Sequence, residues 1–149
     1  MPPGALPNLP AAAFGPATPL LRQFDEAQAR AFYVDFLGFT VDWQHRFGEN
    51  FPLYHQVSLG GCVLHLTGHH GDCCPGGAAR IPVADVATLQ AFQQRLLAAD
   101  YRHAKPGLQD TPWGTREMAI TDPSGNRLTF FADLPPTAQP STTPPEPAP

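Results

Sequence analysis

In the first half of the chain, the spacing of apolar residues changes from that of a strand to that of a helix. A short apolar run at 19–24 is typical of a strand, and in the following stretch, 25–39, apolar side chains recur at helical spacing. Asp25 suits the N-terminal cap of this helix, and Gly38 suits its end. The apolar face of the predicted helix consists of Ala29, Phe32, Tyr33, Phe36 and Leu37. The pattern therefore predicts a strand followed by a helix.

Three stretches with strand-like composition follow this helix, at 40–47, 53–59 and 62–68. Gly60 and Gly61 separate the last two stretches and form a hairpin turn signal. Together with the preceding strand and helix, these stretches predict one βαβββ unit.

The second half of the chain repeats this order of elements. A strand is predicted at 79–83 and a helix at 84–101, with one helical face made of Val86, Leu89, Phe92, Gln93 and Leu96. Three strand-like stretches follow at 101–107, 115–121 and 126–131. The turn sequence DPSGN at 122–126 takes the place that the glycine pair holds in the first half. The repeat predicts two copies of one supersecondary module, about 60 residues apart.

Two such modules predict an α+β domain with a concave groove. Each βαβββ unit forms a curved four-stranded sheet with its helix outside, so alternate strand residues line a groove in which we expect the function to lie. The domain is predicted to span 18–132, with module one at 18–70, module two at 78–132, and Gly76-Gly77 as a flexible joint. The proline-rich ends, 1–17 and 133–149, are interpreted as flexible tails because they offer little surface to bury.

Composition narrows the classes of function. The net charge of −4, with 13 acidic and 9 basic residues, provides no basic stripe for nucleic acid or an anionic membrane. No apolar run has the length of a membrane span, and the N-terminus lacks the features of a secretory signal, which favours a cytoplasmic protein. The three cysteines, of which Cys73 and Cys74 are adjacent, suit a reducing compartment and show no C-x-x-C metal spacing.

Two motifs resemble a known superfamily. FYVDFLGF at 32–39 and PWGTREMAITDPSGNRLTFF at 112–131 are similar to the glyoxalase, bleomycin resistance protein and extradiol dioxygenase (vicinal oxygen chelate) superfamily, and the resemblance covers about 18–132. The PWG-x-RE and DP-x-GN segments look most like the bleomycin resistance protein branch. This branch implies a tandem βαβββ fold and a dimer that exchanges elements between chains. It also implies two grooves at the dimer interface that hold a cationic, aromatic glycopeptide of the bleomycin type without catalysis, which confers antibiotic resistance.

The resemblance also implies which residues contact the ligand. Trp113, between Pro112 and Gly114, and Trp43 match branch positions whose aromatic rings stack on a planar ligand. Glu117 shares the strand face of Trp113 and offers a carboxylate to a cation; the alternative is an ion pair with an arginine. Trp43 can alternatively belong to the core. The weaker candidates for ligand contact, whose alternative role is packing, are Phe47, Phe51 and Tyr54.

The rival hypothesis is a metal-dependent enzyme, a lyase or a dioxygenase. Catalytic members of the superfamily place a divalent metal, such as Zn, Ni, Fe or Mn, on the first and last strands of each module. Alignment on the helices puts those ligand positions at Thr18, His65, Ala78 and Thr129. Because only His65 is a good ligand, we expect no metal, no cofactor and no catalysis. An unorthodox metal site made of His55, His65 and Glu117 stays open as the alternative.

Overall fold

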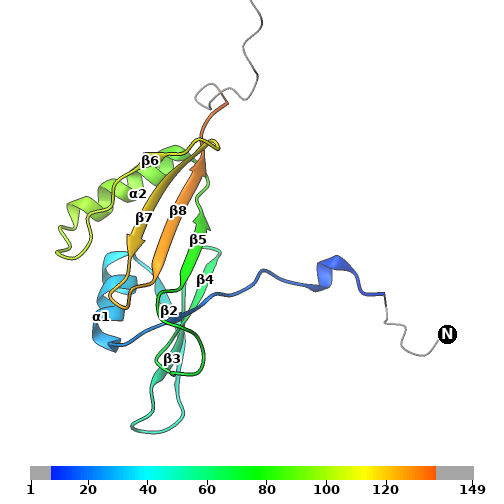
Figure 1. Cartoon of the computed structure of the whole chain (residues 1–149), viewed down its shortest axis with the longest axis vertical. Coiled ribbons are helices and arrows are strands. Elements are labelled where there is room, and N and C mark those ends of the chain that lie inside the picture. The colour runs from blue at the N-terminus through cyan, green and yellow to red at the C-terminus, as the bar shows by residue number, and fades with distance from the viewer. Residues whose placement is uncertain (1–7, 137–149) are drawn as a thin grey trace, which may run out of the picture.

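The computed structural model describes residues 8–136, which form two modules packed side by side (Figure 1). Of the predicted tails, 1–17 and 133–149, residues 1–7 and 137–149 lie outside the described residues. A short helix, η1 (Ala11–Ala13), precedes the first module. The first module contains β1 (Leu20–Arg22), α1 (Glu26–Arg30), η2 (Ala31–Phe36), β2 (Thr40–Arg46), β3 (Leu53–Leu59) and β4 (Cys62–Thr67). The second contains β5 (Ala78–Pro82), α2 (Val86–Ala98), β6 (Gln109–Asp110), β7 (Thr115–Thr121) and β8 (Arg127–Asp133).

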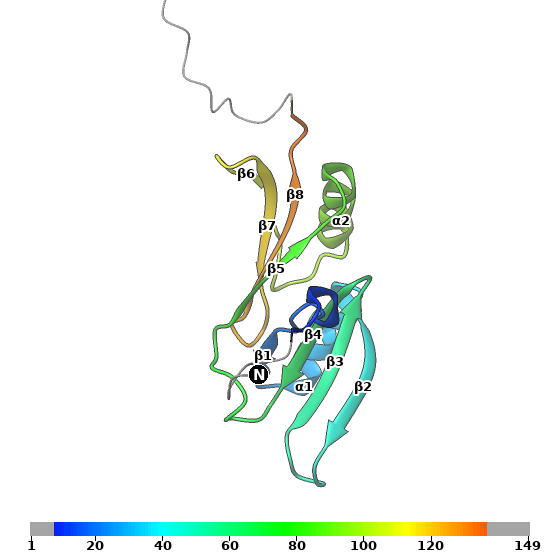
Figure 2. The ribbon, with the colours of Figure 1, turned by 90° about the vertical axis from the view of Figure 1, so that its right-hand side faces the viewer.

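Each module forms one four-stranded mixed sheet, and the two strand orders are equivalent. The first sheet runs β1-β4-β3-β2 (Figure 2), and the second runs β5-β8-β7-β6 (Figure 1). The first strand of each module is parallel to the last one, and the other pairs are antiparallel. This topology confirms the predicted α+β fold with tandem βαβββ modules.

The first helix starts as predicted and then widens. The Asp25 side chain accepts a hydrogen bond from the Gln28 N–H at 2.8 Å, which caps α1. From Ala31 the chain continues as a π-helix, in which the Leu37 N–H donates to the carbonyl of Phe32, five residues earlier. Gly38 then ends the helix with a φ of 91°. The buried side chains of this wider segment are Phe32, Tyr33 and Phe36.

The second helix agrees with its predicted apolar face, whereas the strand predicted after it at 101–107 is wrong. Asp85 caps α2, and Leu89 and Leu96 are buried. Residues 101–107 form turns and irregular backbone, and module two continues with the two-residue strand β6. The Pro106 carbonyl accepts a hydrogen bond from the Gln93 side chain, so this segment binds the helix rather than a sheet edge.

A buried polar network joins the two modules at the DPSGN turn. The Tyr33 hydroxyl donates to the Asp122 carboxylate at 2.6 Å, and the Asn126 side chain donates to the Arg22 carbonyl at 2.6 Å. Burial and the nearby Asp122 carboxylate raise the pKa of Tyr33 far above its usual range. Because one hydrophobic cluster spans both modules, they form one core.

The domain also extends beyond its predicted C-terminal boundary. β8 ends at Asp133, and Leu134 is buried, with its N–H donating to the carbonyl of Gly114. The boundary at residue 132 was therefore placed two residues too early. None of the helices within 8–136 combines the length and apolarity that crossing a membrane requires.

Candidate functional site

The first sheet has an aromatic open face, on the side away from the core. Along β3, His55 and Val57 are buried, so Tyr54 and Gln56 point to the opposite side. Trp43 of β2 pairs with Gln56 and is 43% exposed. Its indole is stacked on the Tyr54 ring, with centroids 5.8 Å apart and planes 6° from parallel. Trp43 is therefore a surface residue of this face and not part of the core.

A directional chain of hydrogen bonds runs beneath this indole. The Gln56 side-chain N–H donates to Asp42 at 3.0 Å, so its carbonyl oxygen faces Nε2 of His65, at 3.0 Å. Nε2 of His65 must then carry the hydrogen, which leaves Nδ1 to accept from the Tyr54 hydroxyl at 2.6 Å. These hydrogen bonds position the Tyr54 ring under Trp43.

The chain of hydrogen bonds ends at Asp42, a residue that the sequence did not single out. The pairing of β2 with β3 shifts register between Val41 and Trp43, as in a β-bulge. The Asp42 carboxylate accepts hydrogen bonds from Gln56 and from the Ser58 hydroxyl, which places it on the open face beside Trp43. Within residues 8–136 it forms no ion pair. Its negative charge is thus uncompensated.

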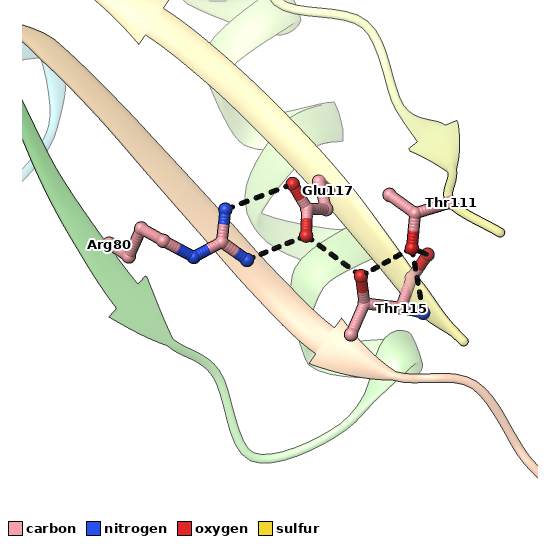
Figure 3. A network of polar contacts seen from close by, with 4 residues as sticks. All are labelled: Arg80, Thr111, Thr115 and Glu117. Carbon is pink, nitrogen blue, oxygen red and sulfur yellow. Dashed lines mark hydrogen bonds and ion pairs between the residues drawn. The ribbon is translucent and has the colours of Figure 1, made fainter. Parts of the chain in front are cut away.

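The open face of the second sheet carries a clamp of polar side chains (Figure 3). Arg80 of β5 reaches across β8 to Glu117 of β7, with nitrogen–oxygen distances of 3.2 and 2.6 Å. Its guanidinium lies over the Phe131 ring, 4.5 Å from the centroid. The Thr115 hydroxyl also donates to Glu117 at 2.7 Å.

This clamp keeps Glu117 ionised. The hydrogen bonds from Arg80 are the largest cause, and with Thr115 and the Trp113 side chain they lower the pKa of Glu117 to about 2, against the opposing effect of burial. The interpretation of Glu117 as the partner of an arginine is confirmed. A ligand cation would have to compete with Arg80 for the carboxylate, so Glu117 is a weaker cation site than the sequence indicated.

Trp113 lies on the tight turn between β6 and β7, at the edge of the same face. The Thr111 hydroxyl is 2.7 Å from that of Thr115 and also accepts from the Thr115 N–H, and Gly114 has a φ of 93°. The turn leaves Trp113 69% exposed. Trp113 is therefore a surface residue and not part of the core.

A pocket of about 670 Å³ opens between the Trp113 turn and the second sheet. Small residues form its floor, where Ala119 of β7 pairs with Thr129 of β8. Arg127 lies on the rim, and its side chain forms no ion pair within 8–136. A larger cavity, of about 830 Å³, has a mostly apolar lining around Leu59 and Phe92 and includes neither tryptophan.

The structure does not bring all predicted ligand-binding residues together in one chain. Trp43 and Tyr54 lie on the first sheet, whereas Trp113 and Glu117 lie on the second. Phe47 is 69% exposed and makes edge contacts with His45 and His69. Phe51 is also exposed, beyond β2. The candidate residues therefore form two half-sites.

The register of the strands corrects the predicted metal positions. Opposite His65 on β1 lies Leu20, not Thr18, and opposite Thr129 on β5 lies Arg80, not Ala78. The alignment on the helices had placed both first-strand positions two residues too early. Neither Leu20 nor Arg80 offers a metal ligand.

The unorthodox metal set is also not assembled in this chain. His55 and His65 point to opposite faces of the first sheet, because His55 pairs with Leu66 and His65 with Gln56. His55 is 4% exposed and bonds to Gln23, and burial lowers its pKa. Glu117 belongs to the other sheet. No group of three or more His, Cys, Asp or Glu side chains in the described part of the chain could hold a metal ion.

Comparison with known families agrees with this geometry. The model of a family described as "glyoxalase superfamily protein" matches residues 8–134, almost the whole described chain. The chain belongs to the glyoxalase superfamily. A search of curated proteins finds no match to this glyoxalase-superfamily chain.

Solved structures of several superfamily proteins share the fold. TnmS3, an antibiotic-binding protein from Streptomyces sp. CB03234, is 22% identical over 81% of this chain and 98% of its own, with a TM-score of 0.62. A bleomycin-binding protein, solved in complex with bleomycin, is 21% identical over 80% and 99%, with a TM-score of 0.61. A lactoylglutathione lyase from Agrobacterium tumefaciens is 19% identical over 78% and 92%, with a TM-score of 0.59. At these identities the likeness establishes the fold alone.

Proposed function

We propose that this glyoxalase-superfamily protein binds and sequesters a planar aromatic small molecule and catalyses no reaction on it. The observation that carries the proposal is the Trp43 indole, which is nearly half exposed and is held parallel to Tyr54 by the hydrogen bonds under that ring. An exposed and preorganised aromatic face suits stacking on a flat ligand, worth about 0.5 to 1.5 kcal/mol beyond area burial.

A homodimer would complete the groove. Each chain presents Trp43 on one sheet and Trp113 on the other, and no described pocket contains both. A second copy that places its second sheet opposite the first sheet of its partner would bring two indoles to one ligand. Bleomycin-type glycopeptides are the named example of such a ligand, and sequestration in the cytoplasm would give antibiotic resistance.

The metal-dependent lyase or dioxygenase remains the less supported alternative. Beside His65 a catalytic metal would need further ligands, and Leu20, Arg80 and Thr129 at the register-matched positions do not supply them. His65 is also engaged on both ring nitrogens, by Tyr54 and Gln56. These contacts suit a residue that supports the aromatic face.

Isothermal titration calorimetry with bleomycin and with the planar cation proflavine tests the proposal, because its readout does not depend on the tryptophans. We expect Trp43→Ala and Trp113→Ala each to weaken binding by at least tenfold. Leu97→Ala, which removes an exposed apolar side chain from the outer helix, is the control and should bind as the wild type does. Unchanged binding in both tryptophan variants, or no binding to the wild type, would contradict the proposal.

A further inference from the structure

The charges around the pocket of the second sheet do not cancel. The charged side chains that line this pocket are Asp110, Glu117 and Arg127. Asp110 accepts two hydrogen bonds from Arg116, at 2.6 and 3.0 Å, and Glu117 is held by Arg80. Among residues 8–136, Arg127 alone of the three has no ion-pair partner. The pocket therefore has an excess of positive charge.

The position of this charge follows from the strand register. Along the open face, Glu117 pairs with Phe131, Ala119 with Thr129, and Thr121 with Arg127. Successive positions on one face are two residues, or about 7 Å, apart. Ala119 and Thr129 have small side chains and thus leave a hollow at this one position of the face. The Arg80–Glu117 clamp lies on one side of the hollow, and Arg127 lies on the other.

We propose that this hollow binds a planar ligand through an anionic group, a carboxylate in the simplest case, which pairs with Arg127. The ring system lies over Ala119 and Thr129, with its edge against Trp113. A guanidinium binds a carboxylate through two parallel hydrogen bonds, so Arg127 selects both charge and orientation. Glu117 does not repel the ligand strongly, because Arg80 neutralises its charge. This assignment rests on the proposed function, the binding of planar ligands. It adds that the second sheet selects a ligand with a negative charge.

The test uses three anthracene probes that differ in one substituent: 9-anthracenecarboxylate, 9-anthracenemethanol and 9-(aminomethyl)anthracene. Their affinities for the full chain are measured by calorimetry at low ionic strength. We expect the second sheet to bind the carboxylate at least fivefold more tightly than the neutral alcohol. In Arg127→Gln this ratio should fall to less than twofold. Arg102→Gln, which removes an exposed arginine from the loop after α2, should keep the ratio.

A second variant locates the bound probe. Ala119→Leu fills the hollow without touching any charge, and it should weaken binding of the carboxylate at least fivefold. Equal affinity for carboxylate and alcohol in the wild type, or a preference that persists in Arg127→Gln, overturns the assignment and leaves the proposed function intact. Unchanged carboxylate binding in Ala119→Leu also overturns it. If none of the three probes binds, both the assignment and the proposed function are wrong.

Discussion

The two sheets of this protein have equivalent strand orders but open faces of opposite character. The first face presents Trp43 over a chain of hydrogen bonds that ends at the Asp42 carboxylate, which forms no ion pair within residues 8–136. The second face presents a hollow over Ala119 and Thr129, bordered by an ion pair and by the guanidinium of Arg127, which has no ion-pair partner among residues 8–136. One face has an excess of negative charge and the other an excess of positive charge.

This difference shows at which equivalent positions the two repeated modules can carry different side chains. On the core side, β4 and β8 carry equivalent buried apolar residues, Leu64 and Leu66 in one and Leu128 and Phe130 in the other. Packing density constrains these positions, because a change in volume there destabilises the fold. The open-face positions do not pack in the core. Their side chains can therefore differ between the two modules without loss of the common backbone.

The largest expected effect comes from breaking the junction that supports both faces. Asp122→Ala removes the buried acceptor of Tyr33 and of the Asn126 side chain, as well as two backbone hydrogen bonds within the turn. We expect a loss of about 3 kcal/mol in the free energy of unfolding, since several buried groups lose their partner at once. Urea denaturation measures the change. Asp133→Ala, in an exposed position of β8, should change stability by less than about 0.5 kcal/mol.

A smaller loss of stability, which depends on pH, is expected when the ion pair on the second face is removed. Folding lowers the pKa of Glu117 from its ordinary value of 4.5 to about 2. The carboxylate therefore stabilises the protein fully above pH 4.5, and this contribution is lost as the pH falls towards 2. Glu117→Gln should lower stability by about 1 kcal/mol at pH 7, the upper range for a partly exposed ion pair.

Urea denaturation of the wild type and Glu117→Gln between pH 3 and pH 7 checks this sign. The two curves of stability against pH should converge as the pH decreases. A difference that stays constant over the whole range would show that the ion pair with Arg80 is not the source of the stabilisation. Asp133→Asn serves as the matched loss of a carboxylate on the same sheet.

Arg127 on the second face favours an anionic ligand, whereas the negative charge of Asp42 on the first face should favour a cationic one. Asp42→Asn removes the negative charge beside Trp43 and keeps one acceptor oxygen for Gln56, while the new amide NH2 can donate to the Ser58 hydroxyl. We expect binding of the cation proflavine to weaken three- to fivefold, with a weaker dependence on salt, because an exposed charge pair contributes up to about 1 kcal/mol. Binding of 9-anthracenemethanol should not change. An equal loss for both probes would indicate a structural role for Asp42 instead.

The smallest effect should follow from removing the histidine beneath the first face. His65→Ala deletes the hydrogen-bond partner of the Tyr54 hydroxyl and the edge contact of the imidazole with Trp43, but it keeps Tyr54, on which the Trp43 indole is stacked. We expect ligand affinity to fall by no more than about threefold, or roughly 0.7 kcal/mol. Elemental analysis of wild type and variant, purified without chelator, should give the same metal content per chain. Stoichiometric metal in the wild type that is lost in the variant would favour the metal-dependent enzyme.

Local patterns predicted most of the fold but less of the site. The helical spacing of Phe32, Tyr33 and Phe36 and the glycine hairpin were sufficient for the order of elements, because core burial imposes a period on the sequence. The π-helical turn and the loop at 101–107 were missed. The loop at 101–107 is held by a contact from outside the segment, the hydrogen bond from the Gln93 side chain to the Pro106 carbonyl. The spacing of apolar residues within one segment does not depend on such a contact and therefore cannot predict it.

By itself the sequence determined the repeat, the core positions and the aromatic residues that are candidates for stacking. Tertiary structure alone decided which charges stay free. Glu117 is neutralised by Arg80, 37 residues away, because β5, β8 and β7 lie side by side in one register. Asp42 reaches the open face because the register of β2 shifts beside it. Charge pairing depends on distances between strands, and these distances exist only once the sheets have formed.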